Sequence, residues 1–179
     1  HEAGGTVYVI CSILRLGILE VSGWRLDGTD GVAIPSLPPG PGAGMVSTAS
    51  GADGSIVAAW NVNPYTPATA SSHTARFDGV EWSDPEPLLP AGVSVGALRI
   101  AVAPNGAMAA AVHLGGGMPA ELAGLTNDGS GWSAPTSLAP ASARPTIRGL
   151  AMSSDGEAVL VYDYEVPGGG FVQKPIAAR

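Results

Sequence analysis

The chain has 179 residues, which is enough for one domain of ordinary size. Hydrophobic residues make up 45% of it and charged residues 13%, a balance that excludes a disordered, self-repelling chain. The net charge of -7, with no basic run, excludes nucleic acid and anionic membranes as partners on electrostatic grounds. The 26 glycines and 16 prolines separate short apolar runs, so we expect many turns.

The first apolar segment, TVYVICSILRLGIL at 6–19, is the most hydrophobic in the chain. It contains Arg15 and is shorter than the roughly 20 residues that span a bilayer, so we interpret it as two core strands and expect no membrane span. Cys11, the single cysteine, excludes an internal disulfide and is expected to be a small buried hydrophobe.

From residue 45 onward, short apolar runs alternate with turn residues, and no stretch has helical periodicity. D-G and N-G pairs predict hairpin turns in which both central residues have positive φ. In chain order, we expect first strands over 45–49, 97–103 and 147–152, second strands over 55–60, 107–113 and 157–162, third strands over 71–77 and 120–126, and short fourth segments at Trp82 and Trp132.

These elements repeat with a period near 50 residues. The turn glycines Gly54, Gly106 and Gly156 are 52 and 50 residues apart, and the segments WSDPEPL and WSAPTSL begin 50 residues apart. A four-stranded meander repeated at this interval predicts an all-β fold of the β-propeller type, with a β-sandwich as the alternative. The tryptophans of the repeat are expected in the core.

The repeat divides the single domain 1–179 into units at 1–40, 41–92, 93–142 and 143–179. Trp24 is interpreted as an early copy of the tryptophan landmark, followed by a loop insertion near DGTDGVAIP. In this alignment the first unit lacks its first strand and the last unit lacks its fourth, which gives about 3.5 blades. Because open strand edges invite pairing, we expect self-association or a second chain that completes the propeller.

The pattern D-G-x-h-x-h-x-W (h, apolar), followed by G-W-S-x-P-x-x-L, resembles the repeats of secreted bacterial sialidase-like or BNR-like β-propeller proteins. The resemblance covers residues 45–179 well and implies a secreted or extracytoplasmic protein. Sialidase activity would require three arginines around a carboxylate, but MVSTA at 45–49 supplies none, and no true Asp-box is matched. We therefore favour a protein without catalysis of its own.

In propellers, the loops that leave second strands and enter first strands open on the face around the central channel. That face is the expected site for a glycan or protein ligand, and its candidate residues are Arg99, Arg148, Asn61, Tyr65, His113, Asp163, Tyr164 and Glu165. The arginines could contact a carboxylate or phosphate. The alternative is that Arg99 and Arg148 satisfy backbone or Asp partners between blades.

Three functional hypotheses follow. The first is a non-catalytic binding module with an unknown ligand. The second is an oligomeric propeller lectin; such lectins repeat an Arg, a Glu and a Trp in each unit, but here Glu121 has no counterpart near Thr74. The third is a fragment of a sialidase-like glycoside hydrolase that uses Asp163 and Glu165. No cofactor and no metal are expected, because three histidines and one cysteine provide no ligand set and DGTDG at 27–31 is an incomplete calcium loop.

Overall fold

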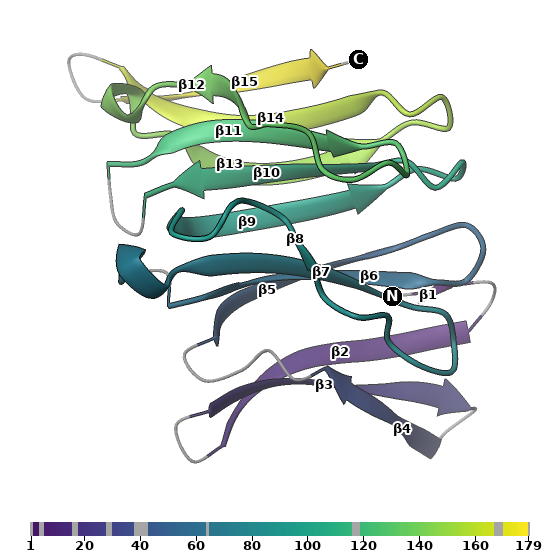
Figure 1. Ribbon diagram of the computed structural model, residues 1–179. Coiled ribbons are helices and arrows are strands. Elements are labelled where there is room, and N and C mark those ends of the chain that lie inside the picture. Colours follow the sequence, from purple (N-terminus) through teal and green to yellow (C-terminus); the bar gives the residue numbers. More distant parts are fainter. Residues whose placement is uncertain are drawn as a thin grey trace.

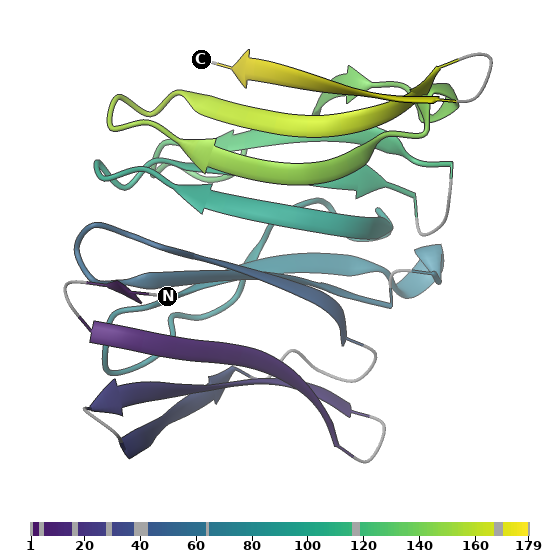
Figure 2. The same cartoon turned by 180° about the vertical axis from the view of Figure 1, so that it is seen from behind.

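The computed structural model of the chain describes residues 2, 3, 6–15, 18–27, 30–37, 43–63, 65–115, 119–166 and 170–178. These residues form four separate antiparallel sheets, numbered 1 to 4 in chain order, in which neighbouring strands follow one another along the sequence. The sheets are stacked one on the next, with sheets 1 and 4 at opposite ends (Figure 1, Figure 2). Four separate stacked sheets correspond to repeated blades, so the β-sandwich alternative is wrong.

Sheets 2 and 3 each contain four strands, and sheet 4 contains three in the described residues. Sheet 1 comprises β1 (Glu2–Ala3), β2 (Thr6–Arg15), β3 (Ile18–Asp27) and β4 (Asp30–Leu37); sheet 2 comprises β5 (Ala43–Ser50), β6 (Ile56–Val62), β7 (Ser71–Phe77) and β8 (Glu86–Pro87). Sheet 3 comprises β9 (Val95–Val102), β10 (Met108–Leu114), β11 (Glu121–Asn127) and β12 (Thr136–Ala139); sheet 4 comprises β13 (Thr146–Met152), β14 (Ala158–Val166) and β15 (Gly170–Ala178).

The expected first, second and third strands are found. The fourth strands differ from the prediction: β8 and β12 begin four residues after Trp82 and Trp132, which form isolated bridges. The expected scarcity of helix is confirmed for the described residues. Two short 3-10 helices, η1 (Pro67–Thr69) and η2 (Ala141–Ala143), lie in the connections. No helix in the described ranges is long and apolar enough to cross a membrane.

Sheet 1 departs from the predicted alignment. Its first strand is present as β1, two residues that pair with the start of β2. Trp24 lies inside the third strand, where it is opposite Val9 and Ala33, so it is not a copy of the later tryptophans. The segment interpreted as an inserted loop is a strand from Asp30 onward: it forms β4, which pairs antiparallel with β3.

The hairpin turns also differ from the prediction. Gly54, Gly106 and Gly156 have φ of 86°, 89° and 85°, but Asp53, Asn105 and Asp155 before them do not have positive φ. Each turn closes with a bond from the N–H two residues before the Asp or Asn, such as Ala103 N–H to Ala107 O at 2.8 Å. These are longer loops with one left-handed glycine, so only the glycine position is conformationally demanding.

The core lies between the sheets. Val57, Leu98 and Val112 are central to the cluster between sheets 2 and 3, and Leu122 and Leu160 to the cluster between sheets 3 and 4. Between sheets 1 and 2, the clusters contain Tyr8, Leu37, Ile56, Trp60 and Phe77. Each internal sheet therefore buries both faces, and the first strands β5, β9 and β13 lie next to one another along the inner side.

Candidate functional site

Asn61, expected on the channel face, is a fully buried connection between sheets 2 and 3. Its Oδ1 accepts a hydrogen bond from the Met45 backbone N–H at 2.8 Å. Its Nδ2 donates to the Val95 carbonyl at 2.5 Å. Because Met45 and Val95 belong to the first strands of neighbouring sheets, the Asn61 amide joins those strands and has no exposed surface for a ligand.

The arginines of the predicted site have partners within the chain. Arg148 Nε donates to Asp163 Oδ2 at 2.5 Å, and the Asp163 side chain is nearly buried. Arg99, on β9, donates through Nη1 to the carbonyl of the preceding residue, Leu98, at 3.0 Å. Glu165 accepts from Arg144 at 3.0 Å. Arg148 and Arg99 thus have Asp and backbone partners, as in the alternative, but each partner lies in the arginine's own sheet and not between blades.

The other three predicted residues differ in their surroundings. Tyr65 is exposed in the connection after β6, whereas Tyr164 is half-buried with its ring 6.2 Å from that of Tyr162. His113 is buried on β10, and burial lowers the pKa of its imidazole. Of the eight predicted residues, Arg148 and Asp163 are brought into direct contact.

An opening that contains none of these eight residues lies between sheets 2 and 3. We call it the 2/3 cleft. It has a volume of about 550 Å³, within the range of ordinary small-ligand sites. Its lining comprises Val57, Thr74, Ala75, Arg76, Ser83, Glu86, Pro87, Met108, Asn127, Gly129, Ser130, Gly131 and Trp132.

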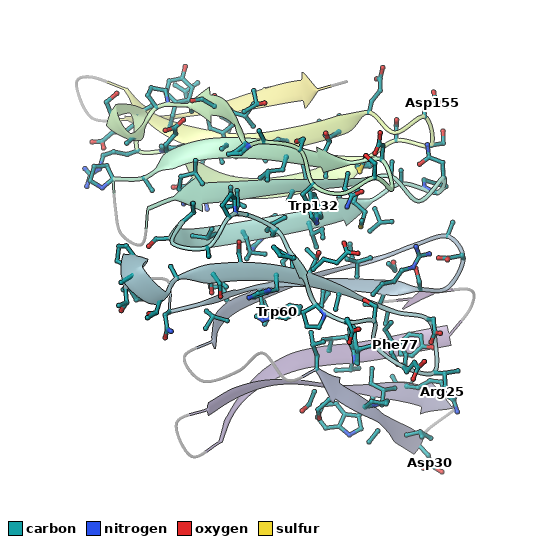
Figure 3. All side chains as sticks on the ribbon, in the orientation of Figure 1. Arg25, Asp30, Trp60, Phe77, Trp132 and Asp155 are labelled. Carbon is teal, nitrogen blue, oxygen red and sulfur yellow. The ribbon has the colours of Figure 1, made fainter. Side chains whose placement is uncertain are left out.

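Trp132 bridges the two walls of this cleft. Its indole Nε1–H donates to Thr74 Oγ1, across the junction of the sheets, at 3.1 Å. Figure 3 shows Trp132 between sheets 2 and 3. Trp82 forms the same kind of bridge one sheet earlier, donating to the Pro35 carbonyl at 2.8 Å. Both tryptophans are half-buried, so the expected core role is correct only in part.

The serine after each tryptophan explains the W-S pair in the repeat. Ser83 Oγ accepts from the Arg76 N–H and Ser133 Oγ accepts from the Thr126 N–H, both at 3.1 Å. The serine N–H groups donate back to the same residues' carbonyls, at 2.7 and 2.8 Å. The serine thus fastens the fourth segment to the third strand and fixes where the indole projects.

Arg76 stands on the third strand with its guanidinium paired to Asp53. The Ser55 hydroxyl donates to the Asp53 carboxylate at 2.7 Å, and this bond, together with the Ser55 N–H and Arg76, lowers the pKa of Asp53. Both side chains of the ion pair are about half exposed, so the pair is worth at most about 1 kcal/mol. Arg76 also lines a second cavity, of about 220 Å³.

A cavity of about 200 Å³ occupies the corresponding place between sheets 3 and 4. Positions 124, 126 and 136 line it, each 50 residues after a lining residue of the 2/3 cleft. They are Gly124, Thr126 and Thr136, where the 2/3 cleft has Thr74, Arg76 and Glu86. The two openings are therefore repeat-related, but the charged groups belong to the 2/3 cleft.

Arg76 and Glu86 were not among the site residues predicted from the sequence. The lectin hypothesis required an Arg, a Glu and a Trp within each unit, whereas here the arginine and glutamate come from sheet 2 and the tryptophan from sheet 3. A search across adjacent units could have found the set. Among the described residues, no group of three or more His, Cys, Asp or Glu side chains is placed to hold a metal ion.

Comparisons with known proteins are informative about fold. No family model matches the chain, and no curated protein matches it. Among solved structures, the Hadza microbial sialidase Hz136 matches with a TM-score of 0.57 at 15% identity, covering 93% of this chain and 44% of that one. The Aleuria aurantia lectin, described as a six-bladed β-propeller with a novel fucose recognition mode, matches with a TM-score of 0.53 at 17% identity, covering 94% and 55%.

The leech intramolecular trans-sialidase, complexed with 2,7-anhydro-Neu5Ac, matches with a TM-score of 0.52 at 13% identity, covering 95% of this chain and 29% of that one. At such identities the similarity shows the fold alone. The four sheets are therefore of the β-propeller type shared by sialidases and propeller lectins. The chain spans about half the length of the first two of these structures.

Proposed function

We propose that this chain is a non-catalytic, extracytoplasmic glycan-binding module of the β-propeller type, and that the 2/3 cleft holds the sugar. The observation that carries the proposal is the convergence of Arg76, Glu86 and Trp132 on one opening of about 550 Å³. That is the residue set expected of a propeller lectin, assembled from two adjacent sheets.

The chemistry of the three side chains suits a saccharide. A guanidinium donates and a carboxylate accepts, so Arg76 and Glu86 can bind neighbouring hydroxyl groups with charge-assisted hydrogen bonds. Trp132 has its N–H engaged by Thr74, which fixes the ring and leaves its exposed part for the C–H face of a sugar. A rigid aromatic surface beside two polar groups orients a ligand and also selects it.

The same lining argues against hydrolysis. Glycosidases ordinarily use two carboxyl groups on either side of the scissile bond. Among the described residues that line the 2/3 cleft, Glu86 is the single carboxylate. Asp163 and Glu165, the pair required by the enzyme hypothesis, are each bonded to an arginine of sheet 4 or its preceding loop.

The test is a panel of free sugars read by ligand-observed NMR. The panel comprises fucose, sialic acid, neutral hexoses and N-acetylhexosamines, because fucose recognition and a sialic acid derivative are named for structurally similar proteins. The dissociation constant of the best ligand is then measured calorimetrically for Arg76→Met and Glu86→Gln. Each variant should weaken binding about tenfold or more, since hydrogen bonds to charged groups contribute roughly 1.5–3 kcal/mol.

The repeat supplies matched controls. Thr126→Met and Thr136→Gln place the same side chains at the corresponding positions of the cavity between sheets 3 and 4. They should leave the dissociation constant unchanged. Failure of every sugar to bind the folded wild-type chain, or equal weakening by the controls, would contradict the proposal. Release of nitrophenol from a nitrophenyl glycoside would instead support the enzyme hypothesis.

A further inference from the structure

Exposed aliphatic side chains gather on the outer face of sheet 1. Val7, Val9 and Leu26 have 40%, 45% and 40% of their surface exposed. Val7 lies opposite Leu26 across the ladder and Val9 opposite Trp24, so these side chains share one face. Tyr8, between the two valines, points the other way and packs edge-on against Phe77 of sheet 2, with ring centroids 6.0 Å apart.

The outer face of sheet 4 has the same character. Val159 is 41% exposed and lies opposite the exposed Ala151 of β13. Val161, two residues further along β14, lies opposite the exposed Pro175 of β15. Leu160, between the two valines, faces inward and belongs to the cluster shared with sheet 3.

Repeat positions show that both faces correspond to faces that are buried elsewhere in the stack. Val57 and Ala109, the counterparts of Val159, are each 2% exposed because the next sheet covers them. Ala58 and Ala110, the counterparts of Val9, are 0% and 2% exposed because the preceding sheet covers them. Sheet 4 thus ends on a surface made to receive a following sheet, and sheet 1 on a surface made to receive a preceding one.

We propose that these two faces form an interface between two copies of this chain, with sheet 4 of each copy on sheet 1 of the other. The two faces are complementary halves of the contact that already joins the internal sheets. A two-fold arrangement forms both contacts at once and closes the assembly. The number of sheets also fits, because two copies supply eight of the described sheets and propellers typically have four to eight blades.

The available area supports a closed pair. Three strands of about nine residues present a face of roughly 400 Å² at strand spacings near 4.8 Å and a rise near 3.3 Å per residue. Two faces give each copy roughly 800 Å², which is the contribution per partner in a standard stable interface. One face alone buries about half of that area per copy. An open pair joined by a single contact should therefore be weak, and the closed dimer with two contacts should be clearly more stable.

The experiment measures solution mass by sedimentation velocity over a micromolar concentration series. Wild type should be a dimer. Val9→Asp and Val159→Asp should each raise the dimer dissociation constant at least about tenfold, because each buries an unpaired carboxylate in both contacts of the pair. Val80→Asp is the matched control: Val80 is 75% exposed in the turn after β7, away from both faces, and this variant should remain dimeric.

Mixing the two variants distinguishes the head-to-tail contact from a symmetric one. The Val9→Asp copy keeps an intact sheet 4, and the Val159→Asp copy keeps an intact sheet 1. Their mixture should associate more strongly than either variant alone, through one intact contact. An interface between two copies of sheet 1 would give no such recovery, and that result would overturn the proposal.

Other outcomes also decide. A monomeric wild type throughout the series would show that a second copy does not cover these faces. A ladder of trimers and larger species would show the contact without the closed pair, and would overturn the pair. Circular dichroism and thermal melting verify folding, and Val9→Lys and Val159→Lys replace any aspartate variant that does not fold. Sugar binding should persist in the monomeric variants, because the 2/3 cleft lies within one chain.

Discussion

Replacing Asn61 with leucine tests whether this buried amide joins sheets 2 and 3 or serves a ligand. Leucine removes both hydrogen bonds, to the Met45 N–H and the Val95 carbonyl. A buried polar group without a partner costs about 1–3 kcal/mol, so two cost roughly 2–6 kcal/mol. The added apolar burial of leucine returns about 1–2 kcal/mol.

The net loss in unfolding free energy should be about 3 kcal/mol, which for a domain of this size lowers Tm by roughly 6–12 °C. Urea titration at pH 7 gives the free energy, and a scanning melt gives Tm. Asn105→Leu is the matched control, because Asn105 is exposed and accepts one bond, from the Ala107 N–H at 3.0 Å. Its loss should stay below about 1 kcal/mol.

Asn61→Asp refines the test. Aspartate keeps an acceptor for the Met45 N–H but cannot donate to Val95 when ionised, and it places a charge in the core. Burial raises the pKa of such a carboxyl, so the stability of this variant should fall as pH rises from 5 to 7. An Asn61→Leu protein that is nearly as stable as wild type, with sugar binding lost, would refute the structural role and restore Asn61 to the ligand site.

Three further predictions concern other contacts. Trp82→Phe keeps an aromatic ring but removes the N–H that donates to the Pro35 carbonyl. The free energy of unfolding, measured by urea titration, should fall by about 1–2 kcal/mol. An unchanged free energy would contradict the bridging role. Burial lowers the pKa of His113 and His73, so the unfolded chain binds more protons than the folded chain. The stability of the fold should therefore be greatest above about pH 6.5 and decline as the pH falls below it. His113→Gln should make Tm depend less on pH in melts between pH 5 and 7.5. Gly106→Ala should cost about 1 kcal/mol through backbone strain alone, since φ is 89° and nothing lies within 4 Å of the added Cβ, whereas a loss of several kcal/mol would indicate an unseen contact.

The repeat was predictable because it is written in local chemistry. A turn glycine must recur wherever the backbone needs positive φ, and strands of small apolar residues must recur wherever a sheet is covered on both faces. The prediction for sheet 1 is wrong because Trp24 is not equivalent to the repeated tryptophans. Trp24 resembles Trp132 in its Gly-Trp context, yet it lacks the following Pro and lies in a third strand.

The candidate site was harder to predict, because it depends on which units are neighbours in space. Arg76 and Trp132 are 56 residues apart and meet only because successive sheets stack face to face. For the predicted channel residues, the information missing from the sequence was burial. A short sequence pattern cannot tell an exposed polar group from one that satisfies the backbone, and Asn61 is the second kind.

The tryptophan bridges run in one direction along the chain. Trp82 reaches back to sheet 1 and Trp132 reaches back to sheet 2, so each indole binds a sheet that precedes its own. During synthesis on the ribosome, the acceptor therefore always emerges before the donor. Sheets 2 and 3 each emerge with the side chain that bonds them to a sheet already made, so this part of the stack can assemble in the order in which it is translated.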